Sequence, residues 1–152
     1  MKILITGEKN KGKSTLLYKI CKNCKCSGVI CLPVFENGMK IGSDVINLLN
    51  GKREVFARIK DKASFSGVVM GKYVINPEGM NYAIKAIEEG IRSDATLIID
   101  EVGSLEMRGK GYYKILEKAI QRNNVVIVVR KSILKKFLKN FPGNYFILEL
   151  RY

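Results

Sequence analysis

Apolar positions along the chain form two kinds of pattern, and the two kinds alternate. Several stretches are continuously or nearly continuously apolar over the length of a strand, which is typical of a parallel sheet buried on both faces. They are residues 2–6, 96–101, 125–129 and 145–150. Between them, apolar residues recur every three or four positions, which predicts helices. These helices lie at about residues 13–21, 77–91 and 112–120. The alternation predicts an α/β fold with a largely parallel sheet.

Two Asn-Gly pairs, Asn37-Gly38 and Asn50-Gly51, follow the first helix and the next apolar strand. Asn-Gly favours a two-residue type I′ hairpin turn, because both central residues of that turn need positive φ. The pairs divide about residues 29–60 into three extended segments, which we expect to form an antiparallel β-meander. With 152 residues and no linker-like stretch, the chain is expected to form a single domain, residues 1–152, that contains the meander.

Two polar residues mark predicted helix starts. Asn76 precedes Pro77, and asparagine at the N-cap followed by proline at the first position is a common way to begin a helix. Ser132 is expected to cap a short helix that contains Leu134 and Phe137.

A segment rich in glycine and lysine lies between the first predicted strand and the first predicted helix. Its sequence, GEKNKGKS, matches G-x-x-x-x-G-K-[ST], the phosphate-binding loop, in the structural context that this loop needs. Gly7 and Gly12 are expected to take backbone angles closed to other residues, so that amide N–H groups surround an anion at a helix N-terminus. The predicted nucleotide-binding residues are Gly7, Glu8, Lys9, Asn10, Lys11, Gly12, Lys13, Ser14 and Thr15.

Within this loop, Lys13 is expected to reach the β- and γ-phosphates and Ser14 to ligate Mg²⁺. A second part of the site is expected at Asp100 and Glu101, which end an apolar strand and so lie at the carboxyl edge of the sheet. Asp100 can hold hydrated Mg²⁺, and Glu101 can orient or deprotonate an attacking water. We therefore predict Lys13 and Glu101 as catalytic residues, and Ser14 and Asp100 as metal ligands.

Composition adds limits on partners and location. The chain carries 27 Lys and Arg against 14 Asp and Glu, a formal net charge of +13, which attracts polyanions. The lysines are scattered along the chain, so a nucleic-acid partner is possible but not favoured. No apolar run is long enough to cross a bilayer, and the first residues build a strand rather than a signal peptide. We expect a cytoplasmic monomer without a membrane partner.

Four cysteines lie close together, at Cys21, Cys24, Cys26 and Cys31. The first pair has the spacing of a metal or redox site. A second C-x2-C pair is missing and the chain has no histidine, which leaves a zinc pattern incomplete. Reduced thiols are therefore favoured, and metal binding stays an alternative.

Three segments in this order resemble the THEP1-type nucleoside-triphosphatase family. They are GEKNKGKST at residues 7–15, MGKYVIN at residues 70–76 and DEVGSLE at residues 100–106, with the meander between the first two. The resemblance covers about residues 1–130. It implies a three-layer P-loop NTPase fold and Mg²⁺-dependent hydrolysis of ATP, GTP and other nucleoside triphosphates to diphosphates, with broad base specificity. It also implies Glu101 as the water-activating residue and Asp100 at the magnesium.

Two other functions are compatible with the phosphate-binding loop. A nucleotide or small-molecule kinase would place its acceptor in the meander, although no arginine-rich lid is evident. A nucleic-acid-associated ATPase would explain the charge, although a second motor domain does not fit in this length. Arg108 and Arg130 follow predicted site elements and are candidates for an arginine finger, but we expect them to be solvated. The GKY segment is expected to shape the site through Lys72 or Tyr73.

Overall fold

The computed structural model describes residues 1–8 and 12–151. Residues 9–11, which carry the predicted nucleotide contacts Lys9, Asn10 and Lys11, lie outside the described part. The helices and strands, in chain order, are β1 (Lys2–Gly7), α1 (Lys13–Cys21), β2 (Cys26–Glu36), β3 (Met39–Asn47), β4 (Arg53–Ile59), η1 (Lys60–Lys62), β5 (Val69–Met70), β6 (Tyr73–Ile75), α2 (Pro77–Arg92), β7 (Thr96–Val102), α3 (Ser104–Met107), α4 (Tyr113–Ala119), β8 (Val125–Val129), η2 (Lys131–Ile133), α5 (Leu134–Asn140) and β9 (Phe146–Leu150).

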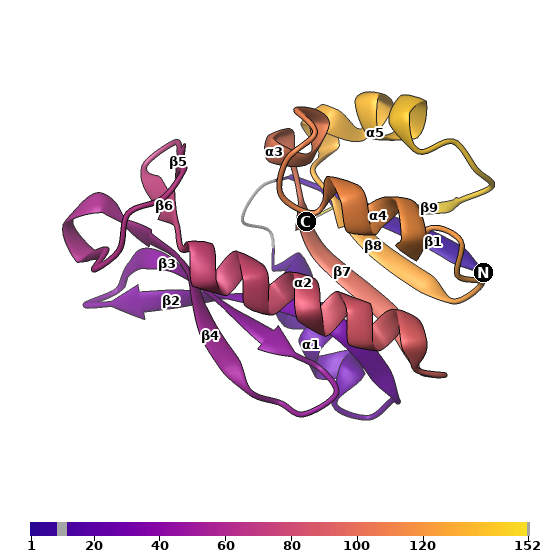
Figure 1. Ribbon diagram of the computed structural model, residues 1–152, viewed down its shortest axis with the longest axis horizontal. Helices are drawn as coiled ribbons and strands as arrows, with labels where there is room; N and C mark the ends of the chain where they lie inside the picture. Colours follow the sequence, from indigo (N-terminus) through magenta and orange to yellow (C-terminus); the bar gives the residue numbers. More distant parts are fainter. Residues whose placement is uncertain (9–11, 152) are drawn as a thin grey trace.

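The strands of the described residues form one mixed sheet in the order β5-β6-β4-β3-β2-β7-β8-β1-β9 (Figure 1). From β2 to β9 neighbouring strands are parallel, and from β5 to β2 they are antiparallel. Strand β2 joins the two halves, because its first residues pair with β7 and most of its length pairs with β3. The predicted α/β class is confirmed, and the antiparallel half extends beyond the expected meander by the short strands β5 and β6.

Helices cover both faces of the sheet. Along β7, Ile98 packs against α1, whereas Leu97 and Ile99 belong to the core beneath α2, α4 and α5. Side chains of successive strand residues point to opposite faces, so this alternation places α1 on one side of the sheet and α2, α4 and α5 on the opposite side. The result is three layers, as expected. At α2, the predicted start is also confirmed: the Asn76 side chain accepts a hydrogen bond from the Glu78 amide, and Pro77 follows the cap.

Two local predictions differ from the structure. Asn37 and Gly38 both have positive φ, 51° and 77°, as a type I′ turn requires, but of the second pair only Gly51 does, at 73°. Residues 48–52 form a longer loop, in which the Gly51 amide bonds to the Asn47 carbonyl, so one left-handed residue is enough. Ser132 lies inside η2 and makes no cap, because α5 begins two residues later after Ile133.

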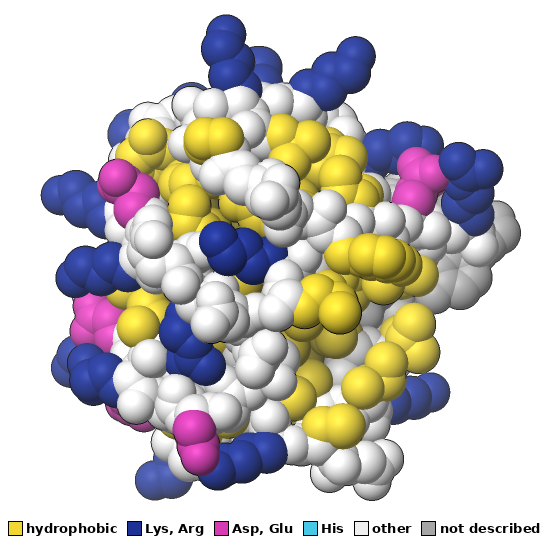
Figure 2. Space-filling model, turned by 90° about the vertical axis from the view of Figure 1, so that its right-hand side faces the viewer, with side chains coloured by type: hydrophobic (Ala, Val, Ile, Leu, Met, Phe, Trp, Pro, Cys, Tyr) yellow, Lys and Arg dark blue, Asp and Glu magenta, His cyan; other side chains and the backbone are white. Residues whose placement is uncertain are grey.

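Strand β9 forms one edge of the sheet and carries exposed apolar side chains. Phe146, Ile147 and Leu148 are 58%, 44% and 41% exposed, and Leu16 and Ile20 on α1 are also exposed. Figure 2 views the side of the molecule on which β9 lies, and it shows hydrophobic side chains gathered there with lysine and arginine side chains around them. This side of the protein is therefore both apolar and positively charged.

Candidate active site

The phosphate-binding loop runs from the end of β1 to the start of α1. Gly12 precedes the helix with φ 74°, a left-handed conformation that favours glycine. Gly7 needs no such angle, which corrects the prediction made for it. A Cβ on Gly7 would lie 2.8 Å from the Leu150 carbonyl oxygen, so the close approach of β9 is what requires glycine there. The two glycines of the motif thus have different physical reasons.

Lys13 is held by main-chain carbonyls of the loop. Its ammonium donates to the Glu8 carbonyl at 2.5 Å and to the Gly7 carbonyl at 3.4 Å. Partial burial lowers the pKa of Lys13, and the charges of Glu101 and Asp100 oppose that shift. The lysine therefore lies at the loop with two carboxylates nearby and with carbonyl partners that a phosphate would replace.

Ser14 and Asp100 come together from α1 and β7. The Ser14 hydroxyl donates to Asp100 Oδ2 at 2.6 Å, and the Cys31 amide donates to the same oxygen at 3.1 Å. The Glu101 amide donates to Oδ1 at 2.9 Å. Asp100 is 1% exposed, and this burial together with the neighbouring charge of Glu101 raises its pKa to about 7. A hydroxyl beside a buried carboxylate at a phosphate loop is a donor set that suits Mg²⁺, so the residues fit the implied cofactor.

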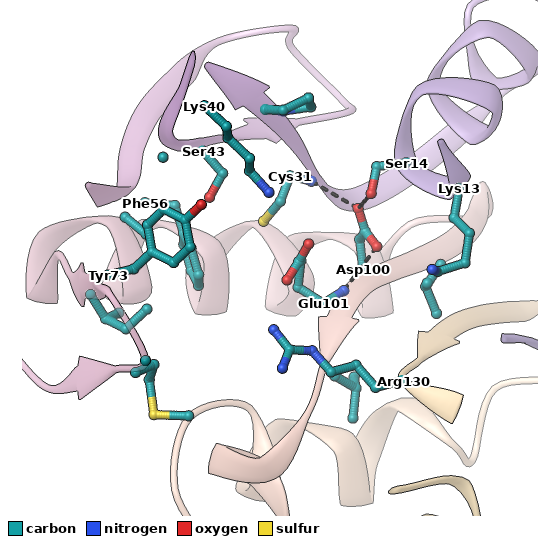
Figure 3. Close-up of a pocket in the computed structure, with 18 of the residues that line it drawn as sticks. Lys13, Ser14, Cys31, Lys40, Ser43, Phe56, Tyr73, Asp100, Glu101 and Arg130 are labelled. Carbon is teal, nitrogen blue, oxygen red and sulfur yellow. Dashed lines mark hydrogen bonds between the residues drawn. The ribbon is translucent and has the colours of Figure 1, made fainter. Parts of the chain in front are cut away.

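Glu101 follows Asp100 directly in the sequence, yet the two carboxylates point in different directions. The Glu101 backbone is left-handed at φ 70°, and the pairing of β7 with β8 shifts register between Ile99 and Val102. A bulge of this kind re-aims a side chain at the end of a strand. Figure 3 shows the result: Asp100 faces Ser14, whereas the Glu101 carboxylate points away from it into the cavity. Backbone strain at a non-glycine residue is frequently found at functional sites.

The last carboxylate of the DEVGSLE segment has a different role. Glu106 is 3% exposed, and its side chain accepts hydrogen bonds from the amides of Gly103 at 2.8 Å and Tyr112 at 3.0 Å. A Cβ on Gly111 would lie 1.9 Å from Glu106 Oε2, so glycine is required beside it. Glu106 therefore fixes the loop that follows β7 and does not face the cavity.

A cavity of about 740 Å³ joins these groups. Lys13, Ser14, Thr15, Asp100 and Glu101 all line it, and Figure 3 shows Asp100 and Glu101 between Lys13 and Tyr73. Arg130 also lines it while being exposed, as expected of a solvated charge, and in Figure 3 its guanidinium lies on the side of Glu101 away from Lys40. Arg108 is exposed, as expected, with a nitrogen 3.3 Å from Met70 Sδ. From the GKY segment, Tyr73 lines the cavity and Lys72 does not.

The cysteines separate into two groups. Cys31 on β2 lines the cavity and donates its amide to Asp100, and burial raises the pKa of its thiol. Cys21 lies at the end of α1 near Cys26, and burial followed by a hydrogen bond with Cys26 raises its pKa to about 12. All four are free thiols. In the part of the chain that the structure describes, no three or more Cys, Asp or Glu side chains group as a metal site.

Fold and site together define a P-loop nucleotide-binding enzyme, in which a phosphate loop after β1 faces a carboxylate pair at the end of β7. The match to the NTPase family extends over residues 2–149. The chain belongs to this family, the THEP1-type nucleoside-triphosphatases, which are hydrolases. No helix within residues 1–8 and 12–151 has the length and apolar character needed to span a membrane.

Named relatives and solved structures agree with this assignment. The chain is 35% identical to the nucleoside-triphosphatase THEP1 of Pyrobaculum aerophilum, over 84% of this chain and 72% of the relative. It is 28% identical to the Archaeoglobus fulgidus protein of the same name, over 93% and 86%. THEP1 from Aquifex aeolicus superposes with a TM-score of 0.75 at 25% identity, covering 99% of this chain and 90% of that one. A human cancer-related nucleoside triphosphatase has a TM-score of 0.68 at 17% identity, covering 99% and 88%, and shows the shared fold.

The raised pKa of Asp100 predicts how stability depends on pH. In the folded protein Asp100 keeps its proton up to about pH 7, whereas an ordinary aspartate carboxyl has a pKa near 3.8. The contribution of Asp100 to the free energy of unfolding is therefore fully present at low pH and is lost as the pH rises between these two values. From pH 5 to pH 8 this group is expected to remove about 2–3 kcal/mol from the free energy of unfolding of the nucleotide-free protein. Urea unfolding at several pH values should show a shallower decline in Asp100→Asn. Asp61→Asn, at an exposed site, is the matched control, and equal slopes for Asp100→Asn and wild type would contradict the assignment.

Proposed function

We propose that this protein hydrolyses nucleoside triphosphates to diphosphates and inorganic phosphate, with Mg²⁺ as cofactor and little selection for the base. The observation that carries the proposal is the junction of Lys13, the Ser14–Asp100 pair and Glu101 at one cavity. The names of the relatives support the reaction, since they specify a nucleoside triphosphate without specifying a base.

Each residue has a distinct part in the proposed reaction. The loop amides and the Lys13 ammonium bind the phosphates and balance their charge. Ser14 and Asp100 would hold Mg²⁺, which would neutralise charge on the phosphate oxygens. Glu101 accepts the proton of the attacking water, because its carboxylate faces the cavity beside the position of the phosphate loop. The Arg130 guanidinium, on the same side of the site, stabilises negative charge that develops on the transferred group.

The test is phosphate release from ATP, GTP, CTP and UTP, each with and without Mg²⁺. We expect release from all four with rates within about tenfold of one another, because the described residues around the loop bind phosphate rather than base. Chelation by EDTA is expected to abolish release. Release that persists fully in EDTA would contradict the metal assignment, and nucleotide binding without release would contradict hydrolysis. Cytoplasmic location and a monomeric state stay predictions of the sequence, and so does the expectation that a nucleic-acid partner is possible but not favoured.

A further inference from the structure

The cavity extends well beyond the groups that hydrolysis needs. More than half of the described residues that line it belong to β2, β3, β4 and the β5–β6 hairpin. Of these, Figure 3 shows Lys40, Ser43, Phe56 and Tyr73 on the opposite side of Glu101 from Lys13. At about 740 Å³, the whole cavity has the size of a site for a complete small molecule. A water molecule attacking phosphorus leaves the meander end of this volume unused.

Aromatic side chains form the far wall. Phe35, Phe56 and Tyr73 come from three different strands and all line the cavity. Phe35 is 60% exposed although it is a large apolar side chain, whereas Phe56 is only 7% exposed. Exposed aromatic surface in a concave site is typical of a place where a ligand ring packs. The wall therefore favours a planar, largely apolar group.

Polar groups lie beside the aromatic wall. Lys40 and Ser43 on β3 line the same end of the cavity, and the Lys40 ammonium lies 5.7 Å from the centre of the Tyr73 ring. A cation next to aromatic rings suits a ligand that carries a negative charge on a ring system. In Figure 3 the Lys40 ammonium and the Glu101 carboxylate both point into the space between the aromatic wall and the phosphate loop.

We propose that the meander end of the cavity binds a second substrate, a small planar organic anion with a hydroxyl group, which accepts the γ-phosphoryl group in place of water. The inference rests on the proposed nucleotide site, because that site supplies the phosphoryl group. Phe35 and Tyr73 pack on the ring, Lys40 pairs with the anionic group, and Glu101 faces the hydroxyl. Glu101 can serve either acceptor, since it lies between the two ends of the cavity.

The transfer step is balanced without any further reagent. The hydroxyl oxygen forms a bond to the γ-phosphorus, and the bond from that phosphorus to the β–γ bridging oxygen breaks. The electron pair of the broken bond stays on the nucleoside diphosphate. The hydroxyl proton passes to the Glu101 carboxylate and then to solvent. The products are a phosphate monoester and a nucleoside diphosphate.

Binding is tested first with anilinonaphthalene sulfonate, a fluorescent planar anion, in the presence of saturating ADP and Mg²⁺. We expect Phe35→Ser and Lys40→Gln each to weaken probe binding about tenfold, as loss of one aromatic or charged contact implies. Phe146→Ser is the matched control, since Phe146 is 58% exposed on β9, at the opposite edge of the sheet. Probe binding that is lost in Phe146→Ser and kept in the two cavity variants would overturn the proposal.

Transfer is tested with naphthol sulfonate, which adds a hydroxyl to the same kind of ring, and with ATP labelled at the γ-phosphate. We expect label in naphthyl phosphate as well as in inorganic phosphate, and a ratio of the two products that falls about tenfold in Phe35→Ser and Lys40→Gln. The ratio should not change in Phe146→Ser. Normal release of inorganic phosphate with no labelled naphthyl phosphate overturns the acceptor site alone. Absence of both products overturns the nucleotide site and this inference together.

Discussion

Glu101→Gln is expected to reduce turnover by about 10²–10⁴-fold while nucleotide binding is kept. Glutamine has the same shape but cannot accept a proton from water. The substitution also leaves the left-handed backbone at φ 70° as easy to form as before, since neither side chain is branched at Cβ. Single-turnover phosphate release, measured beside titration of binding with a non-hydrolysable triphosphate, separates the two effects.

The control for this variant is Glu117→Gln, which neutralises an exposed carboxylate on α4 that does not line the cavity. It should retain wild-type turnover. A loss of less than about tenfold in Glu101→Gln would show that water is activated by another group, because general-base catalysis contributes more than that.

Lys13→Ala is expected to lower kcat/KM by at least about 10²-fold, with much of the loss in nucleotide affinity. The reason is the position of the ammonium at the phosphate loop, where it bonds only to the carbonyls of Gly7 and Glu8 among the described residues. Without it, the loop amides alone would balance the phosphate charge. Calorimetric titration with ADP and steady-state kinetics measure the two components.

Lys19→Ala is the matched variant, because it removes an equal charge from the last turn of the same helix, α1. It should bind ADP as tightly as the wild type. Should both variants lose affinity equally, the net charge of the chain, and not the Lys13 contact, would account for nucleotide binding.

Much of the parallel half of the fold is predictable from local patterns. The strand–loop–helix at residues 2–21 and the Asn76–Pro77 helix start appear in the structure within a residue or two of their expected positions. These features depend on apolar periodicity and capping, which act within a few neighbouring residues. The short strands β5 and β6 have no such signal, because two or three residues are too few to show a period, and they are defined by the pairing of β6 with β4 and with β5.

The sequence predicts which motif residues belong to the site, but it does not predict how all of their side chains are oriented. The motif placed Ser14 and Asp100 together, and the structure joins them by a hydrogen bond. The bulge that turns Glu101 into the cavity depends on long-range pairing of β7 with β8, which no local pattern reports. Arg130 lines the cavity only because β8 ends next to β7, so its place also follows from the topology. Of the aromatic wall only Tyr73 was anticipated, through the GKY segment, whereas Phe35 and Phe56 escaped prediction because they lie on separate strands.

The apolar edge at β9 has a consequence for the behaviour of concentrated solutions. Among the described strands β9 pairs only with β1, so its outer main-chain groups form a template on which another strand can add. Natural proteins commonly prevent such strand addition with charged residues or prolines in the edge strand, whereas β9 carries the exposed apolar residues Phe146, Ile147 and Leu148. Besides the ion pairs of Glu149 with Lys131 and Arg151, protection comes from the +13 charge of the whole molecule, which makes copies repel one another. The protein should therefore stay dispersed at low ionic strength, whereas salt screens the repulsion between copies and allows them to associate.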